Sequence, residues 1–158
     1  MKTSIRKGLG FGITSGVITT LGLIVGLYSS ANSKITIIGG ILIIAIADSL
    51  SDAFGIHISE EYALKEKEKN IWLATFSTLF FKFIFAITFI VPFLFLKLNS
   101  SVIIDLIWGL VLISLFSYYS AKKNRTSVKK VVFEHLLISI VVIVLTYLIG
   151  MIIGKVFI

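Results

Sequence analysis

The residues with the clearest chemical potential are five ionisable side chains close together in the chain. Asp48 and Asp52 are four residues apart, a spacing that places two side chains on one face of a helix. His57 and Glu61 share this spacing on a different face, and Glu60 lies beside them. Carboxylate oxygens with at most one imidazole suit Mg²⁺, Mn²⁺, Fe²⁺ or Zn²⁺ better than Cu(I). The five residues are therefore predicted metal ligands.

The apolar segment that precedes Asp48 sets its depth in a membrane. The 13 residues from Ile35 to Ala47 are nearly all apolar and span ~20 Å as a helix, whereas the hydrocarbon core of a bilayer is about 30 Å thick. Asp48 and Asp52 must therefore enter the apolar layer or lie at its edge. A charged side chain at a helix centre costs roughly 2.5–3.5 kcal/mol. We expect both carboxylates to face protein or water, in a functional site or in an interhelical hydrogen bond.

The other three candidate ligands have a second explanation each. Glu60 and Glu61 also fit the wet cytoplasmic end of a membrane helix, where carboxylates are solvated. His57 fits a packed histidine with a satisfied hydrogen bond as well as it fits a metal ligand.

Three further ionisable residues lie in later apolar segments. Lys82 is about eleven residues into the third segment and either extends its amine toward the membrane surface or pairs with an aspartate. Glu134 begins the fifth segment, where it is either a step on an ion path or a membrane-edge pair with His135. Asp105 lies near the outer end of the fourth segment and is expected to face water.

The composition identifies the element that must position these residues as a membrane helix. Hydrophobic residues make up 57% of the 158 residues and charged residues 15%, against about 45–50% and about 25% in soluble domains. This excludes a soluble enzyme and a free nucleic-acid-binding module, and the absence of cysteine excludes disulfides and thiolate sites. We predict an all-α integral membrane protein, a single domain over residues 1–158. Its five transmembrane helices are expected at 8–28, 35–58, 71–96, 102–119 and 131–153.

The distribution of basic residues gives the orientation and the expected surroundings. With a cytoplasmic N-terminus, the inside segments carry 11 Lys and Arg and the outside segments carry 3, as the positive-inside rule requires. The C-terminus is then outside, and the net charge of +7 needs no nucleic-acid partner. The partner is the lipid bilayer, and the usage of Ile and Lys favours a prokaryotic plasma membrane.

Glycine and proline add two predictions about helix packing. Gly12 with Gly16, and Gly22 with Gly26, are pairs of small residues at the four-residue spacing that lets membrane helices approach closely. Pro92 is expected to kink the third helix.

The order of motifs resembles the vacuolar iron transporter family, which includes the nodulin-21-like proteins. The segment Gly8-Leu9-Gly10-Phe11-Gly12-Ile13-Thr14 is similar to the family's first-helix pattern, which has an Asp where this chain has Phe11. Glu61-Tyr62 matches the Glu-Tyr that ends the family's second helix, with His57 at the family's Met position. Glu134 and Thr146-Tyr147-Leu148-Ile149-Gly150 are similar to the family's last helix. The family's glutamate-rich cytosolic helices are missing here, and only about residues 63–70 remain in their place.

This resemblance implies five membrane helices, a homodimer, and export of Fe²⁺ or Mn²⁺ from the cytosol with proton exchange. A two-fold axis would bring together two copies each of Asp48, Asp52 and His57. Two carboxylates in a low-dielectric site titrate as a coupled pair, and a proton held between them would be displaced by an arriving cation. The prediction is a divalent metal transporter, not an enzyme, without a prosthetic group.

Two other functions compete with transport. A non-transporting membrane assembly or accessory protein fits the glycine-rich first segment and the missing cytosolic helices. An intramembrane metallohydrolase would use Glu60, Glu61 and His135, with Glu61 and His135 meeting at a common Zn²⁺, although no H-E-x-x-H motif occurs.

Overall fold

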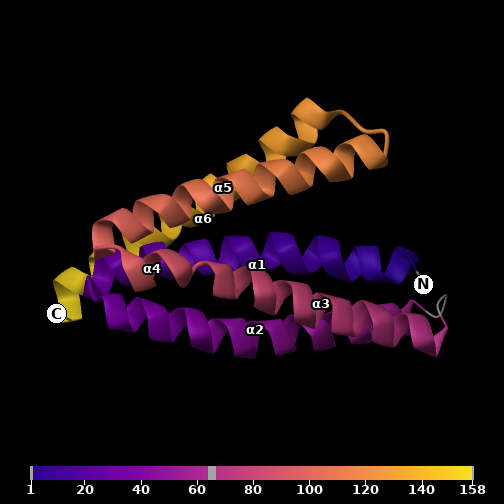
Figure 1. Ribbon diagram of the computed structural model, residues 1–158, viewed down its shortest axis with the longest axis horizontal. Coiled ribbons are helices and arrows are strands. Elements are labelled where there is room, and N and C mark those ends of the chain that lie inside the picture. Colours follow the sequence, from indigo (N-terminus) through magenta and orange to yellow (C-terminus); the bar gives the residue numbers. More distant parts are fainter. Residues whose placement is uncertain (1, 64–66, 158) are drawn as a thin grey trace.

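The structure is a computed structural model that describes residues 2–63 and 67–157, and it is helical from end to end (Figure 1). The helices are α1 (Lys2–Ala31), α2 (Lys34–Tyr62), α3 (Glu68–Thr88), α4 (Val91–Phe95), α5 (Leu98–Lys123) and α6 (Val128–Phe157). Five spans are long and apolar enough to cross a membrane, with α3 and α4 together forming the third. The all-α membrane fold is thus confirmed, and the helices extend beyond the predicted apolar segments, except that the third span ends at Phe95, one residue before its predicted end.

A short turn joins α1 to α2 and makes them antiparallel neighbours. Asn32 adopts a positive φ of 45°, a left-handed conformation that asparagine tolerates better than most residues. Ser33 then caps α2, because its side chain accepts a hydrogen bond from the backbone N–H of Thr36 at 3.4 Å. The polar residues between the first two apolar segments therefore reverse the chain.

The third span breaks where Pro92 is expected to kink it. Helix α3 ends at Thr88, and the N–H groups of Phe89 and Ile90 bond to carbonyls only three residues back, at 3.2 and 3.0 Å. Proline has no N–H to continue the helical ladder and its ring clashes with the preceding turn. The predicted kink is confirmed, with α4 continuing the span.

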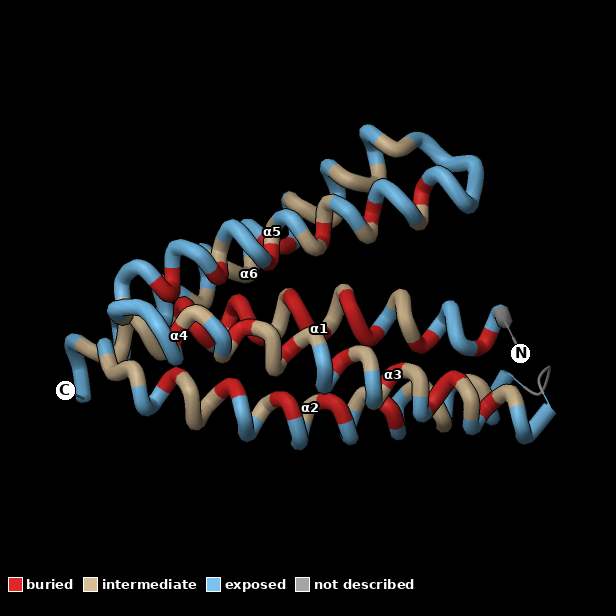
Figure 2. The backbone as a smooth tube through the Cα atoms, in the orientation of Figure 1, coloured by how far each residue is buried: buried red, intermediate tan, exposed pale blue. Residues whose placement is uncertain are grey.

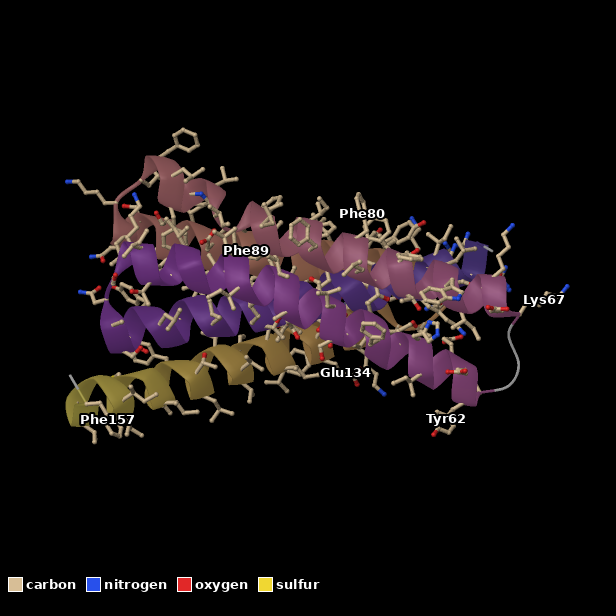
Figure 3. All side chains as sticks on the ribbon, turned by 90° about the horizontal axis from the view of Figure 1, so that it is seen from below. Tyr62, Lys67, Phe80, Phe89, Glu134 and Phe157 are labelled. Carbon is tan, nitrogen blue, oxygen red and sulfur yellow. The ribbon has the colours of Figure 1, made fainter. Side chains whose placement is uncertain are left out.

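Helix α1 is the centre of the bundle and packs against α2, α3, α5 and α6. Figure 1 shows α2 and α3 on one side of α1, while α5 and α6 lean away from it toward the end that holds the N-terminus. Figure 2 shows buried positions recurring along α1. In Figure 3, Tyr62 and Lys67 lie at one end of the molecule and Phe157 at the other. Large apolar side chains cover the outer surface of α6, as a lipid-facing helix requires.

Two sets of glycines explain how α1 can pack closely on both sides. A methyl group added at Gly12 would lie 3.0 Å from the backbone N of Lys82 in α3. One added at Gly22 would lie 3.1 Å from the Val142 side chain in α6. The close helix packing predicted from the small-residue pairs is therefore present, with Gly12 against α3 and Gly22 against α6.

Gly8 offers a direct test of this packing. A methyl group there would lie 2.5 Å from Ser77 Cβ and 2.6 Å from the Ala74 carbonyl, so α1 and α3 would have to separate. We expect Gly8→Ala to lower the free energy of unfolding by about 1–3 kcal/mol, measured by denaturant titration in detergent. Gly39→Ala is the matched control, since no described residue outside the backbone of its own helix lies within 4 Å of its methyl position. An equal loss in both variants would contradict the packing account.

Candidate functional site

Asp48 and Asp52 of α2 meet a buried lysine of α3. The Lys82 Nζ lies 2.6 Å from Asp48 Oδ2 and also forms an ion pair with Asp52 Oδ2. The Lys82 side chain is only 2% exposed. Of the two explanations for Lys82, pairing with an aspartate is therefore the one that the structure shows, and the lysine pairs with both.

Two hydroxyl groups of α1 complete this arrangement. Ser15 Oγ donates a hydrogen bond to Asp52 Oδ2 at 2.6 Å and accepts one from Lys82 Nζ at 3.0 Å. Thr19 Oγ1 donates to Asp48 Oδ2 at 3.0 Å. We call these five residues, Ser15, Thr19, Asp48, Asp52 and Lys82, the carboxylate–lysine cluster. Its members come from three helices, so it forms only when α1, α2 and α3 pack together.

Glycine in α1 makes room for the lysine. A methyl group at Gly16 would lie 3.1 Å from Lys82 Cγ and 3.2 Å from the Lys82 carbonyl oxygen. Gly16 is one position from Ser15, so the residue that contacts the lysine stem is adjacent to the one that binds its ammonium. Gly16 is thus part of the site.

The charges of the cluster do not balance within it. Two carboxylates face one ammonium, which leaves one negative charge in excess if all three groups are ionised. The two aspartate side chains are 26% and 22% exposed at the surface of the single chain, whereas the lysine is enclosed. Hydrocarbon cannot solvate a carboxylate, so these partly exposed oxygens need water, a cation or another protein surface beside them.

His57 lies apart from the carboxylate–lysine cluster in its contacts. Its Nδ1 is 3.0 Å from the Thr75 hydroxyl of α3, and its ring centroid is 4.6 Å from that of Trp72. Thr75 in turn donates to the Ile71 carbonyl. The imidazole is therefore satisfied by packing and a hydrogen bond between α2 and α3.

The glutamates predicted as ligands have separate surroundings. Glu60 forms an ion pair with Lys7 of α1 at 2.8 Å, and Glu61 is exposed. Glu134 lies 3.9 Å from Lys130 on the surface of α6. Across residues 2–63 and 67–157, no three His, Asp or Glu side chains gather as a metal ion would need. A single chain thus brings Asp48 and Asp52 together without a third acidic or imidazole ligand.

The hydrolase alternative requires a zinc site, and its residues lie in separate surroundings within the described part of the chain. His135 Nδ1 lies 2.7 Å from Ser117 Oγ of α5, and Glu60 is held by Lys7. Glu60, Glu61 and His135 form no common cluster.

Asp105 is a residue whose surroundings the sequence did not reveal. The expectation that it faces water is wrong, because its relative exposure is 0%. Neither carboxylate oxygen has a hydrogen-bond partner within the described structure. Asp105 lies about two turns inside the start of α5, and Ser101, one turn earlier, donates to the Pro92 carbonyl at the helix break.

A conservative change tests whether Asp105 binds anything. A buried carboxyl without a partner makes no net contribution to stability, so we expect Asp105→Asn to unfold at the same temperature or higher, measured by thermal unfolding in detergent. A loss of more than about 2 kcal/mol would contradict this, because it would reveal a polar or cationic partner for the carboxylate.

The fold and the cluster together define a class of protein. This is a helical integral membrane protein with ionisable side chains inside its span, and in such proteins these groups mark substrate and ion pathways. The chain belongs to the VIT family, whose model matches residues 52–151, and this confirms the resemblance to the vacuolar iron transporters. Comparisons with curated proteins and with solved structures return no match.

The family relationship indicates membrane metal-ion transport, and its members are transporters rather than enzymes. The matched segment includes Asp52, Lys82, Asp105 and Glu134. It leaves out α1 and most of α2, so the hydroxyl groups and Asp48 that complete the cluster lie outside it.

Proposed function

We propose that this protein exports Fe²⁺ or Mn²⁺ from the cytosol in exchange for protons, with Asp48 and Asp52 as the ligands that the ion passes. The observation that carries the proposal is a carboxylate pair within the membrane span, held by one buried lysine. Carboxylate and hydroxyl oxygens suit both ions. The excess negative charge of the cluster favours a cation over an anion.

The lysine supplies a physical route to proton exchange. A divalent cation bound by the two aspartates would stand next to the Lys82 ammonium, and the repulsion between them favours loss of the ammonium proton. Departure of the cation restores the attraction of both carboxylates, and the neutral amine then takes up a proton. In this scheme the proton that is exchanged for the metal ion belongs to Lys82 and is not one held between the two aspartates.

The position of Phe11 supports this choice of ligands. Phe11, Ser15 and Thr19 follow one another at four-residue spacing, so they share one face of α1. Ser15 and Thr19 bind the two aspartates, and Phe11 stands where the similar family pattern has Asp. The α2 carboxylates therefore lie along the α1 face that carries an acid in the family.

A homodimer with α2 near the symmetry axis would cover the exposed side of the cluster. Outside the backbone of α2 itself, no described residue lies within 4 Å of a methyl group added at Gly55, so a second helix has room to approach there. The partly exposed Asp48 and Asp52 lie on the same helix. A second copy would double the carboxylates, with Glu60, Glu61 and Glu134 serving the cytosolic approach, whereas His57 of each chain stays packed against Thr75 and Trp72.

The orientation follows from the charged ends of the bundle. Lys7, Lys67, Lys122 and Lys123 belong to the end that holds the N-terminus and the α2–α3 and α5–α6 connections. We place this end in the cytosol of a prokaryotic cell, with the transporter in the plasma membrane. No prosthetic group and no nucleic acid enter the proposal.

Flux measurements in proteoliposomes test the proposal. Wild-type protein should move Mn²⁺ or Fe²⁺ across the membrane, with a rate that rises when an opposing pH gradient is imposed. Vesicles without protein set the background. Absence of flux, together with absence of saturable Mn²⁺ binding by calorimetry in folded protein, would instead support the accessory-protein alternative.

A further inference from the structure

A second region of the molecule has a chemistry opposite to that of the carboxylate–lysine cluster. A cavity of about 600 Å³ lies between the first half of α1, the second half of α5 and the beginning of α6. Its lining residues belong to α1, α5 and α6, and Figures 1 and 2 show that α5 and α6 lean away from α1 toward the end that holds the N-terminus. We call it the basic wedge; its lining includes Arg6, Lys7, Lys123, Phe116 and Ile138.

The charged side chains of the described residues that line the basic wedge are all cationic. Arg6, Lys7 and Lys123 line it, and among the residues that the structure describes no aspartate or glutamate does. Lys7 is already paired with Glu60, so Arg6 and Lys123 contribute most of the unbalanced charge. Asn124 and hydroxyl groups of α1 and α5 add hydrogen-bonding groups. This set attracts an anion and repels a metal cation, which separates the wedge from the proposed ion path.

The polarity of the wedge changes with depth in the membrane. Along α1 the lining runs from Arg6 near the helix end to Ile18, and along α5 it runs from Lys123 back to Ile113. Ile18 follows Arg6 by 12 helical steps, which rise ~18 Å, and this is comparable with one half of a bilayer core of about 30 Å. The cavity is therefore basic at the membrane surface and apolar toward the bilayer centre.

We propose that the basic wedge binds an anionic phospholipid, with its phosphate at Arg6 and Lys123 and an acyl chain along Ile18, Ile113 and Ile138. Basic pockets between membrane helices at the cytoplasmic side bind anionic headgroups, and the graded lining matches an amphiphile rather than a free ion. The bound lipid fills the space that side chains leave open and holds the α5–α6 pair at a fixed distance from α1.

Native mass spectrometry of the full chain in detergent tests this site. Phosphatidylglycerol and phosphatidylcholine with identical acyl chains are titrated separately, and the lipid-bound fraction is measured. We expect phosphatidylglycerol to bind about tenfold more tightly or better, because each basic group near a headgroup contributes on the order of 1 kcal/mol. Equal binding of the two lipids would overturn the proposal.

Two charge-matched double variants assign the binding to the wedge. Arg6→Gln with Lys123→Gln should weaken phosphatidylglycerol binding about tenfold or more. Lys129→Gln with Lys130→Gln removes the same charge from exposed positions outside the cavity lining and should leave binding unchanged. An equal loss in both would show attraction to surface charge and overturn the site.

Two further measurements separate the lipid from other anions and from misfolding. Inorganic phosphate at millimolar concentration should fail to displace phosphatidylglycerol, and displacement would overturn the assignment to a lipid. Gly10→Leu places a side chain beside Phe116 in the cavity, where a Cβ meets it at 3.4 Å, an ordinary contact distance. This variant should keep its helical circular dichroism yet lose lipid binding, and retained binding would overturn the proposal.

Discussion

Replacing Asp48 and Asp52 by asparagine together is expected to reduce metal flux to the background of empty vesicles. The amide keeps the size of the carboxyl group but removes the negative charge that attracts a divalent cation. The change also leaves the buried Lys82 without a counter-charge. Removing the partners of a buried charge costs about 3–5 kcal/mol, so the free energy of unfolding in detergent should fall by a comparable amount.

The single variants and a surface control make this result interpretable. Each single change to asparagine should reduce flux, because each aspartate accepts a hydrogen bond from one hydroxyl of α1 and pairs with Lys82. Glu68→Gln removes one carboxylate from an exposed position at the start of α3 and should leave flux and stability unchanged. Wild-type flux in the folded double variant would refute the assignment of these ligands.

Replacing Lys82 by methionine should separate metal binding from transport. Without the ammonium, the two carboxylates carry an uncompensated double negative charge, so the protein without metal should be less stable. A divalent cation no longer has to overcome repulsion, and we expect Mn²⁺ to bind about tenfold more tightly or better by calorimetry, a gain of about 1.4 kcal/mol. Flux should fall, because release is slower and the group that exchanges the proton is absent.

The control for this change is Lys69→Met, which removes an exposed lysine from the same helix. It should alter neither Mn²⁺ affinity nor the dependence of flux on the pH gradient. If Lys82→Met bound Mn²⁺ no more tightly than wild type and still transported it with pH dependence, the lysine would have no part in coupling.

The five membrane helices could be predicted because each is encoded locally by a long apolar run. The break before Pro92 was equally local, since proline cannot donate to the helical ladder. The positions of the helix ends were harder to predict, because Glu68 and Lys123 belong to their helices although neither residue is apolar. Hydropathy reports where a segment enters lipid, while the helix itself continues into the polar layer.

Only part of the site could be predicted in the same way. The depth of Asp48 and Asp52 follows from counting residues along α2, and their proximity follows from helical spacing. The contribution of Ser15 and the double pairing of Lys82 depend on how three helices rotate against one another, which no single segment encodes. The burial of Asp105 likewise depends on how the helices pack together, so its place near the end of an apolar segment was misleading.

The central claim is that the carboxylate pair of α2 binds the transported ion, and anomalous X-ray scattering from crystals soaked in Mn²⁺ tests it most directly. The account predicts an anomalous peak within coordination distance of both Asp48 and Asp52, with the Lys82 ammonium displaced from at least one of them. A peak at Glu60 or Glu61 with none at the aspartates would contradict the account.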